Sequence, residues 1–365
     1  MVVVFAINFG VFYLLQDSTY CFYLEFNKYL LLYIYTMIQT PFDIATLWTL
    51  SPGDFDNKAK LLSEWQAQNN PVYKEWIQLA KLNQLVQEEA LVTGIPFLPI
   101  SFFKSHDVCP SGSTPEQIFL SSGTTQQLRS RHLVTDLSFY NASLVLGFER
   151  VFGPVSNYVF IALLPSYLEN GSASLIYMVD QLIQRSGSAL SGYYLNSVDE
   201  VHVAYQNALS SGKKPFVFGV AYALLDIAAS GIRLTEALIL ETGGMKGRRQ
   251  ELTKAELHER LMEGFQTDTI LSEYGMTELL SQAYCLKDQT FACPPWMQIR
   301  IRDAYDPFDE VPFGQKGGVN VIDLANQNSC AFIQTDDLGR LTPHGFLLEG
   351  RIEASDIRGC NQLVD

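Results

Sequence analysis

Cysteine is scarce in this sequence, with six residues among 365, and no two of them form a Cys-x-x-Cys pair. That density is too low for a small secreted fold held by disulfides, so we expect free thiols and a reducing, cytoplasmic location. The five histidines include no His-Glu-x-x-His pattern, so no zinc site is indicated. The Walker A spacing of P-loop ATPases and the Gly-x-Ser-x-Gly elbow of serine hydrolases are also missing.

Basic residues are in the minority, at 25 against 39 acidic ones, for a formal net charge of −14. A polyanion would be repelled by this balance, so nucleic acid is not expected as a partner. The 47% of hydrophobic residues supplies enough apolar side chains for a sizeable core.

Long apolar runs are absent as well. The first 36 residues are unusually apolar, but their runs at 2–15 and 29–36 are each too short for a membrane-spanning helix. They also lack the basic start and small-residue cleavage site of a signal peptide. We favour a start codon placed too early, with Met37 as the true beginning, and expect no firm membrane insertion. The alternative is a membrane-associating N-terminal segment.

Apolar periodicity predicts an α/β core over residues 37–294. A helical opening is expected over 54–92, and two prolines favour an extended crossing at 95–104. Buried strands are predicted at 118–120, 158–164, 216–220, 237–240 and 269–274, and helices at 136–150, 174–185, 198–210 and 254–264. Capping boxes at Ser197 and Thr253 mark two helix starts. This alternation is typical of a mostly parallel sheet covered by helices.

The pattern changes after residue 294. Three strand-like segments, MQIRIRD, GGVNVID and CAFIQTDD, follow one another without helical patterns between them. We therefore expect a β-rich subdomain over 295–365.

Several polar clusters follow predicted strands, and each alone has an ordinary structural explanation. The segment 118–131, IFLSSGTTQQLRSR, can wrap phosphate oxygens, but such a cluster is more often a plain turn. In SEYGMTE (272–278), Thr277 and Glu278 would begin a helix, where backbone N–H groups favour anions and Glu278 can hold Mg²⁺; the alternative is a helix cap with a first-turn acid.

Three more clusters complete the set. In ETGGMKGRR (241–249), two adjacent glycines would let a flat ring lie against the backbone. The alternative is a turn that only ends the strand. In QTDDLGRL (334–341), a carboxylate could accept hydrogen bonds from ribose hydroxyls. The alternative is an Asp-rich hairpin turn. LEGRIEASDIRGC (348–360) ends the series.

In this order the clusters resemble the motif series of the adenylate-forming superfamily, from about residue 95 to 360. The segment at 98–104 and the short length are similar to LuxE-type acyl-protein synthetases (long-chain fatty acid–protein ligases), which are related to phenylacetate-CoA ligases. The resemblance implies the fold of the superfamily's large N-terminal domain, without its small C-terminal domain.

The resemblance also implies roles for individual residues, with ATP and Mg²⁺ as cofactors. Residues expected to hold the β- and γ-phosphates are Ser122, Gly123, Thr124 and Thr125. Residues expected to border adenine are Gly243, Gly244 and Tyr274. Thr277 would touch the α-phosphate, Glu278 would bind Mg²⁺, Asp337 would hold the ribose, and Arg351 would stand at the ribose or at the hinge.

The chain departs from the superfamily pattern at two points. The phosphate loop has Gln126, Gln127 and Arg129 where a lysine is usual. No lysine follows Lys316, so the adenylation lysine of the small domain is also missing. Arginines are left as the only obvious cations for pyrophosphate release, namely Arg129, Arg131, Arg351 and Arg358.

The function that the resemblance implies is ATP-dependent activation of a fatty or other carboxylic acid, with transfer of the acyl group to a protein cysteine. Cys360 is the expected acceptor, because nearby Arg358 can lower the pKa of its thiol; a structural cysteine is the alternative. A reductase or carrier protein would be the transfer partner. The competing interpretations are an acyl- or aryl-CoA ligase and an inactive nucleotide- or acyl-binding protein.

Overall fold

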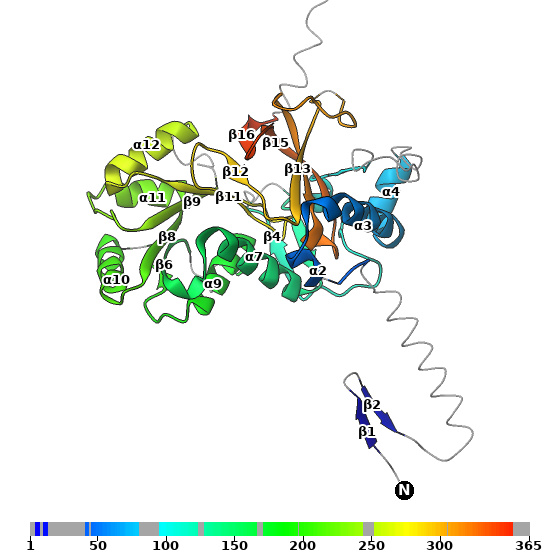
Figure 1. Cartoon of the computed structure of the whole chain (residues 1–365), viewed down its shortest axis with the longest axis horizontal. Coiled ribbons are helices and arrows are strands. Elements are labelled where there is room, and N and C mark those ends of the chain that lie inside the picture. Colours follow the sequence, from blue (N-terminus) through cyan, green and yellow to red (C-terminus); the bar gives the residue numbers. More distant parts are fainter. Residues whose placement is uncertain are drawn as a thin grey trace, which may run out of the picture. The chain divides into compact units, whose positions relative to one another are not determined.

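A computed structural model describes the chain over defined segments. These are residues 4–7, 10–13, 41–43, 45–79, 95–122, 128–165, 171–195, 197–243, 252–304 and 306–352. They belong to two compact units, Met1–Phe42 and Asp43–Asp365. In the first unit, β1 (Val4–Ile7) and β2 (Gly10–Tyr13) form an antiparallel hairpin (Figure 1). Across the described segments, no helix has both the length and the apolar character needed to cross a membrane.

The second unit is built on one large sheet, in which twelve strands of the described residues take part. Its parallel half has the order β10-β9-β8-β6-β7. The bounds are β6 Tyr158–Leu163, β7 Gly192–Tyr193, β8 Lys214–Val220, β9 Leu238–Thr242 and β10 Leu271–Tyr274. Every residue of β6 is buried, which explains its uninterrupted apolar sequence. The predicted strands over 158–274 are therefore confirmed.

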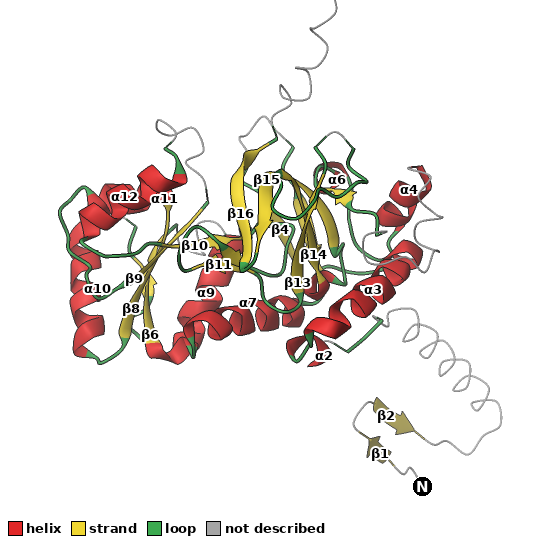
Figure 2. Ribbon diagram, turned by 45° about the horizontal axis from the view of Figure 1, so that its top comes forward, coloured by secondary structure: helices red, strands yellow, loops and turns green. Residues whose placement is uncertain are grey.

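Helices cover both faces of this parallel half, as Figure 2 shows. They are α7 Leu137–Phe152, α9 Ser174–Ser186, α10 Val198–Ser210, α11 Ala221–Ala228 and α12 Lys254–Phe265. Alternate side chains of β6 serve opposite faces: Val159 and Ile161 join the core formed with α10, α11 and α12, whereas Phe160 packs on Phe148 of α7. This arrangement confirms the predicted α/β class.

The helix starts follow the predicted capping chemistry. Thr253 forms a complete capping box with Glu256, and the Ser197 hydroxyl accepts a hydrogen bond from the Glu200 N–H. Helix α11 was not predicted, because its apolar sequence follows β8 directly and its N-cap position, Val220, supplies no side-chain hydrogen bond.

The other half of the sheet is antiparallel and comes from the C-terminal part of the chain. Its strands are β11 Ala283–Cys285, β12 Phe291–Ala292, β13 Met297–Arg302, β14 Gly317–Asp323, β15 Phe332–Thr342 and β16 Gly345–Arg351. The three strands predicted after residue 294 are confirmed. Because β11 pairs with β10, the two halves share one sheet. The pairing of β12 with β16 continues this sheet across residue 295, where the predicted subdomain boundary stays a prediction.

The opening of the second unit is helical, as predicted. It comprises α2 Ala45–Trp48, the 3₁₀ turn η1 Pro52–Asp54, α3 Phe55–Asn69 and α4 Pro71–Leu79. The remainder of the helix predicted to residue 92 lies outside the described residues. The extended crossing is confirmed only at β3 (Leu98–Pro99), which pairs with β15. Residues 100–105 contain no proline, so each has an N–H to donate. Within them, α6 (Phe102–Ser105) forms a helical turn that buries Phe103.

The predicted strand at 118–120 exists but belongs elsewhere. It is β4 (Gln117–Leu120), which pairs antiparallel with β5 (Arg131–Val134) in a separate two-stranded sheet. The Ser/Thr/Gly segment is thus a hairpin loop, and it does not connect a parallel strand to a helix. Short 3₁₀ turns, η3 (Val155–Asn157) and η4 (Leu324–Asn326), complete the elements.

Candidate functional site

The candidate site lies at the carboxyl edge of β9 and β10. These strands are parallel, with Thr242 opposite Glu273, so the residues that follow each strand meet at one edge. Gly243 comes directly after β9 and has a φ of 72°, a left-handed conformation that favours glycine. Gly244 lies outside the described residues. The clusters at 241–249 and 272–278 therefore start at the same edge.

Tyr274, Asp337 and Arg351 form a hydrogen-bonded group that joins this edge to the antiparallel half of the sheet. The Tyr274 hydroxyl donates to Asp337 Oδ2 over 3.0 Å, and Arg351 Nε donates to Asp337 Oδ1 over 3.0 Å. Strand register sets the second contact, since Asp337 on β15 lies opposite Arg351 on β16. Burial, together with the Asp337 charge, raises the pKa of Tyr274 well above its usual value, so the phenol is a neutral donor.

A buried arginine supports the strand that carries Asp337. Arg302 Nη2 donates to the Thr335 carbonyl over 2.7 Å, and Nη1 donates to Asn320 Oδ1 over 2.9 Å. Gly318 makes room for it, because a Cβ there would lie 2.4 Å from Arg302 Cζ. The carboxylate predicted to bind the ribose thus stands on a strand that a buried arginine supports.

Thr277 and Glu278 lie in a turn, so the predicted helix start at this position is wrong. Residues 275–282 are irregular, with one turn bond from Leu279 N to the Met276 carbonyl at 3.2 Å. The buried carboxylate of Asp323 accepts the Leu280 and Ser281 N–H groups, each at 2.9 Å. Those donors are satisfied by a residue far along the chain, so no helix forms and no helix N-terminus faces the site.

The Glu278 carboxyl is the point where several segments meet. Its residue is only 4% exposed. The pKa of this carboxyl is raised overall, mainly by burial, although the Ser130 hydroxyl and the positive charges of Lys104 and Arg351 act to lower it. Arg351 therefore acts on Glu278 as well as on Asp337.

Ser130 closes the base of the predicted phosphate loop. Ser121 N donates to the Ser130 carbonyl over 3.0 Å, and Ser130 N donates to the Ser121 hydroxyl over 2.9 Å. The loop between them begins with Ser122, which is exposed. Gly123, Thr124 and Thr125 lie outside the described residues, as does Cys360. The base of the loop nevertheless lies near the Glu278 carboxyl, because the Ser130 hydroxyl acts to lower the pKa of that carboxyl.

The basic residues next to this loop have other partners. The Arg129 guanidinium donates to the Ser121 carbonyl, and Arg131 pairs with Asp107 over 3.1 Å. The cations that act on Glu278 are instead Arg351 and Lys104, and the sequence analysis missed Lys104. Lys104 lies on the short helix α6, where a lysine carries no sign of a role in a site.

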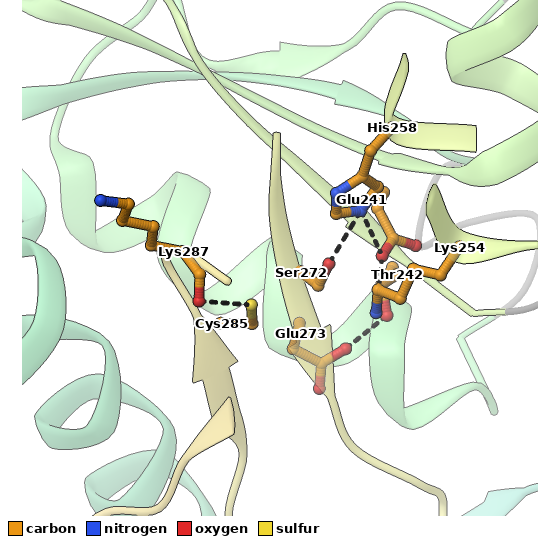
Figure 3. A network of polar contacts seen from close by, with 8 residues as sticks. All are labelled: Glu241, Thr242, Lys254, His258, Ser272, Glu273, Cys285 and Lys287. Atoms are coloured by element: carbon orange, nitrogen blue, oxygen red, sulfur yellow. Dashed lines mark hydrogen bonds and ion pairs between the residues drawn. The ribbon is translucent and has the colours of Figure 1, made fainter. Parts of the chain in front are cut away.

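Two buried carboxylates on β9 and β10 form a second polar group at the same edge (Figure 3). Glu241 lies 3.0 Å from Lys254 Nζ and 3.4 Å from His258 Nε2. Although its burial acts in the opposite direction, these partners lower the pKa of Glu241. On the other face of the sheet, Thr242 donates to Glu273, and burial raises the pKa of Glu273 to about 7. The sequence analysis assigned neither carboxylate a role.

The residues present suit a magnesium ion that arrives with a nucleotide. No cluster of three or more His, Cys, Asp or Glu side chains exists within the described segments, so these offer no protein-only cage. Mg²⁺ commonly binds through one or two carboxylates together with substrate phosphates and water. A single buried carboxyl near the base of the predicted phosphate loop fits that mode.

Comparison with known proteins identifies the fold. No protein family matches the sequence, and no curated protein matches it. The open form of 2-hydroxyisobutyryl-CoA ligase, in complex with 2-HIB-AMP and CoA, matches with a TM-score of 0.58 at 12% identity, over 82% of this chain and 69% of that one. The fold is that of the large domain of adenylate-forming enzymes.

Two further structures match. The same ligase in its postadenylation state gives a TM-score of 0.57 at 12% identity, over 81% of this chain and 66% of that one. ATP-bound MatB from Rhodopseudomonas palustris gives 0.49 at 18% identity, over 64% of this chain and 47% of that one. The chain therefore spans about half of MatB. At such identities the likeness establishes the fold alone, so the chemistry rests on this chain's own residues.

Proposed function

We propose that this chain uses ATP to activate a carboxylic acid as an acyl-adenylate. The observation that carries the proposal is the convergence on Glu278. Its carboxyl meets Ser130 at the base of the Ser/Thr/Gly loop, and the charges of Lys104 and Arg351 act on it. A site that combines a phosphate-type loop, a buried carboxylate and two cations is suited to a magnesium–triphosphate complex.

Each residue then has a task. Asp337 accepts the ribose hydroxyls, and the neutral Tyr274 phenol and Arg351 hold its carboxylate in place. The Thr277 hydroxyl binds the α-phosphate. A carboxylate oxygen of the substrate attacks the α-phosphorus, the bond to the β-phosphate oxygen breaks, and pyrophosphate leaves. A bound Mg²⁺ would neutralise phosphate charge. Lys104 and Arg351 stabilise the pyrophosphate, for which the sequence analysis found only arginines.

The finer proposal follows the motif order of the sequence. We infer a LuxE-type acyl-protein synthetase that activates a fatty acid and passes the acyl group to the thiolate of Cys360, with AMP as the leaving group. A reductase or carrier protein would then take the acyl group. The alternative is an acyl- or aryl-CoA ligase, which the fold of 2-hydroxyisobutyryl-CoA ligase also suits. An inactive nucleotide- or acyl-binding protein is the third possibility.

The test is ATP–pyrophosphate exchange with the full chain and Mg²⁺ across aliphatic and aromatic acids. We expect acid-dependent exchange, and we expect Glu278→Gln to lower it about 100-fold, the scale of removing one electrostatic stabiliser. Glu259→Gln, at an exposed glutamate of α12, controls for the change of charge. Absence of exchange with every acid, while ATP still binds, would favour the binding-protein alternative.

A further inference from the structure

A buried histidine and a buried asparagine hold the turn that carries Thr277 and Glu278. His132 on β5 is 0% exposed, and its Nδ1 lies 2.7 Å from the Thr277 carbonyl oxygen. Asn326, at the end of η4, donates from Nδ2 to the Glu278 carbonyl over 2.8 Å and to the Cys330 carbonyl over 2.9 Å. Two consecutive carbonyls of the turn are therefore bound by side chains that lie outside it.

The hydrogen-bond partners determine where the protons lie. A carbonyl only accepts, so Nδ1 of His132 carries the ring proton. The amide of Asn326 cannot be reversed, because its oxygen would then face two carbonyl oxygens. His132 Nε2 lies 3.1 Å from Asn326 Oδ1, and that contact lacks a proton while the ring is neutral. Burial lowers the pKa of His132 to about 4, so at neutral pH the ring holds the turn through Nδ1.

The same ring also contacts the helix that carries Lys104. Phe103 of α6 packs edge-on against the His132 ring, with centroids 5.9 Å apart. Lys104 is the next residue, and its charge acts on the Glu278 carboxyl. His132 thus lies between the segment that supplies the carboxylate and the segment that supplies a cation.

The turn needs this external support. Residues 275–282 lack helical bonds, and neither Thr277, which is half-buried, nor Glu278, which is buried, belongs to a strand. A buried carbonyl that loses its donor is costly, so the turn would rearrange if His132 or Asn326 lost its N–H groups.

We propose that His132 and Asn326 are positioning residues of the nucleotide site, which fix the turn so that Glu278 meets the metal carried by ATP and Thr277 meets the α-phosphate. This inference rests on the function proposed above. Neither residue touches the nucleotide; both act through the two backbone carbonyls. The ligand class whose binding they govern is a magnesium nucleoside triphosphate.

The matched pair His132→Asn and His132→Gln tests it. The amide nitrogen of asparagine takes the place of Nδ1 and keeps a donor toward Thr277, whereas that of glutamine reaches the Nε2 position and loses it. Gln66→Leu is the control. From α3, Gln66 bonds only backbone groups of the loop that contains Asn326, namely the carbonyls of Asn326, Gln327 and Ser329 and the N–H of Ala331. It contacts neither the Asn326 side chain nor Thr277 or Glu278.

Two readouts are needed, both on the full chain. Amide hydrogen exchange over 275–282 without nucleotide reports the turn itself, and calorimetry reports the Mg²⁺ concentration that supports half-maximal ATP binding. We expect His132→Gln to speed the exchange and to raise that concentration about tenfold, equivalent to one buried hydrogen bond. His132→Asn should stay near wild type, as should Gln66→Leu.

The outcomes separate the two proposals. If the wild type shows acid-dependent pyrophosphate exchange but both histidine variants match it in amide exchange and Mg²⁺ dependence, the positioning role is refuted and the function survives. An equal effect of Gln66→Leu would also refute it, because general loosening of the loop would then suffice. If the wild type binds no magnesium–ATP, the proposed function fails instead.

Discussion

Glu273 offers the sharpest test of the site's electrostatics. Its carboxyl is buried between Thr242, which donates to it, and Gly275, where a Cβ would lie 2.2 Å from Oε1. Burial is the main reason that its pKa is raised from 4.5 to about 7. Glu273→Gln keeps the shape and the acceptor for Thr242 but removes the titration.

The raised pKa of Glu273 determines whether its contribution to stability rises or falls with pH. Below pH 4.5 the carboxyl is protonated in both folded and unfolded chains, so it has no pH-dependent effect. Between pH 4.5 and 7 the folded state keeps a proton that the unfolded state has lost, so its contribution to stability falls as pH rises. A rise in pKa from 4.5 to about 7 corresponds to about 3 kcal/mol of stability, which is fully lost above pH 7. Glu273→Gln should therefore gain about 3 kcal/mol over wild type between pH 4.5 and 7.5.

Unfolding measurements on the wild type alone would not reveal the contribution of Glu273, because His132 gives an opposite pH dependence of stability. The pKa of His132 is lowered from 6.5 to about 4, so the unfolded state binds the extra proton and stability rises with pH in that window. Its contribution is of similar size, about 3 kcal/mol, and nearly cancels that of Glu273 between pH 4.5 and 6.5. The difference between variant and wild type isolates the carboxyl.

The assay is urea unfolding of the full chain at pH 4.5, 6 and 7.5, with Glu259→Gln as the charge control. We expect the stability of Glu273→Gln relative to wild type to increase at each step. A difference that stays constant across the three pH values would refute a buried, proton-binding Glu273. A difference that decreases with pH would mean that Glu273 is ionised and paired in the folded chain.

Three further predictions concern other parts of the chain. Asp337→Asn should weaken ATP binding about tenfold in calorimetry, because the ribose loses charge-assisted bonds; unchanged affinity would place the ribose elsewhere. Labelled fatty acid with ATP should leave a hydroxylamine-sensitive label that Cys360→Ser abolishes while pyrophosphate exchange continues. A label that persists in this variant means another acceptor. Removal of residues 1–36 should leave the melting temperature unchanged, since they belong to a separate compact unit; a clear decrease would show that they stabilise the second unit.

Local signals predicted much of the fold. The strands β6, β8 and β9 were visible as apolar runs because they are buried on both faces, and the Thr253 capping box marked α12. The prediction was wrong where hydrogen bonds from a residue far along the chain determine the local structure. The helix expected at Thr277 is absent because Asp323, more than 40 residues away, takes the N–H groups that would begin it.

The candidate site divides in the same way. Tyr274, Asp337 and Arg351 were each assigned a separate role by the resemblance, and the structure joins the three by hydrogen bonds; their roles stay predictions. His132 could not be predicted. It contacts Thr277 and Asn326 across separations of 145 and 194 residues, and a histidine in a short strand shows no sign of either contact. Lys104 was likewise hidden, because a lysine on a short helical turn is ordinarily a surface residue.

Lys104 and Arg351 make the site's charge consistent with its proposed task, although the chain as a whole is acidic. Arg351 is 76% exposed in its side chain, yet its guanidinium bonds Asp337 and acts on Glu278. Lys104 approaches the same carboxyl from α6. Under the proposed function, these two cations oppose the negative charge of the nearby carboxyl groups before a nucleotide enters. A triphosphate can then bring its own magnesium ion to Glu278 while both cations turn to the phosphates. An acidic protein can in this way bind a polyanionic substrate without a basic surface.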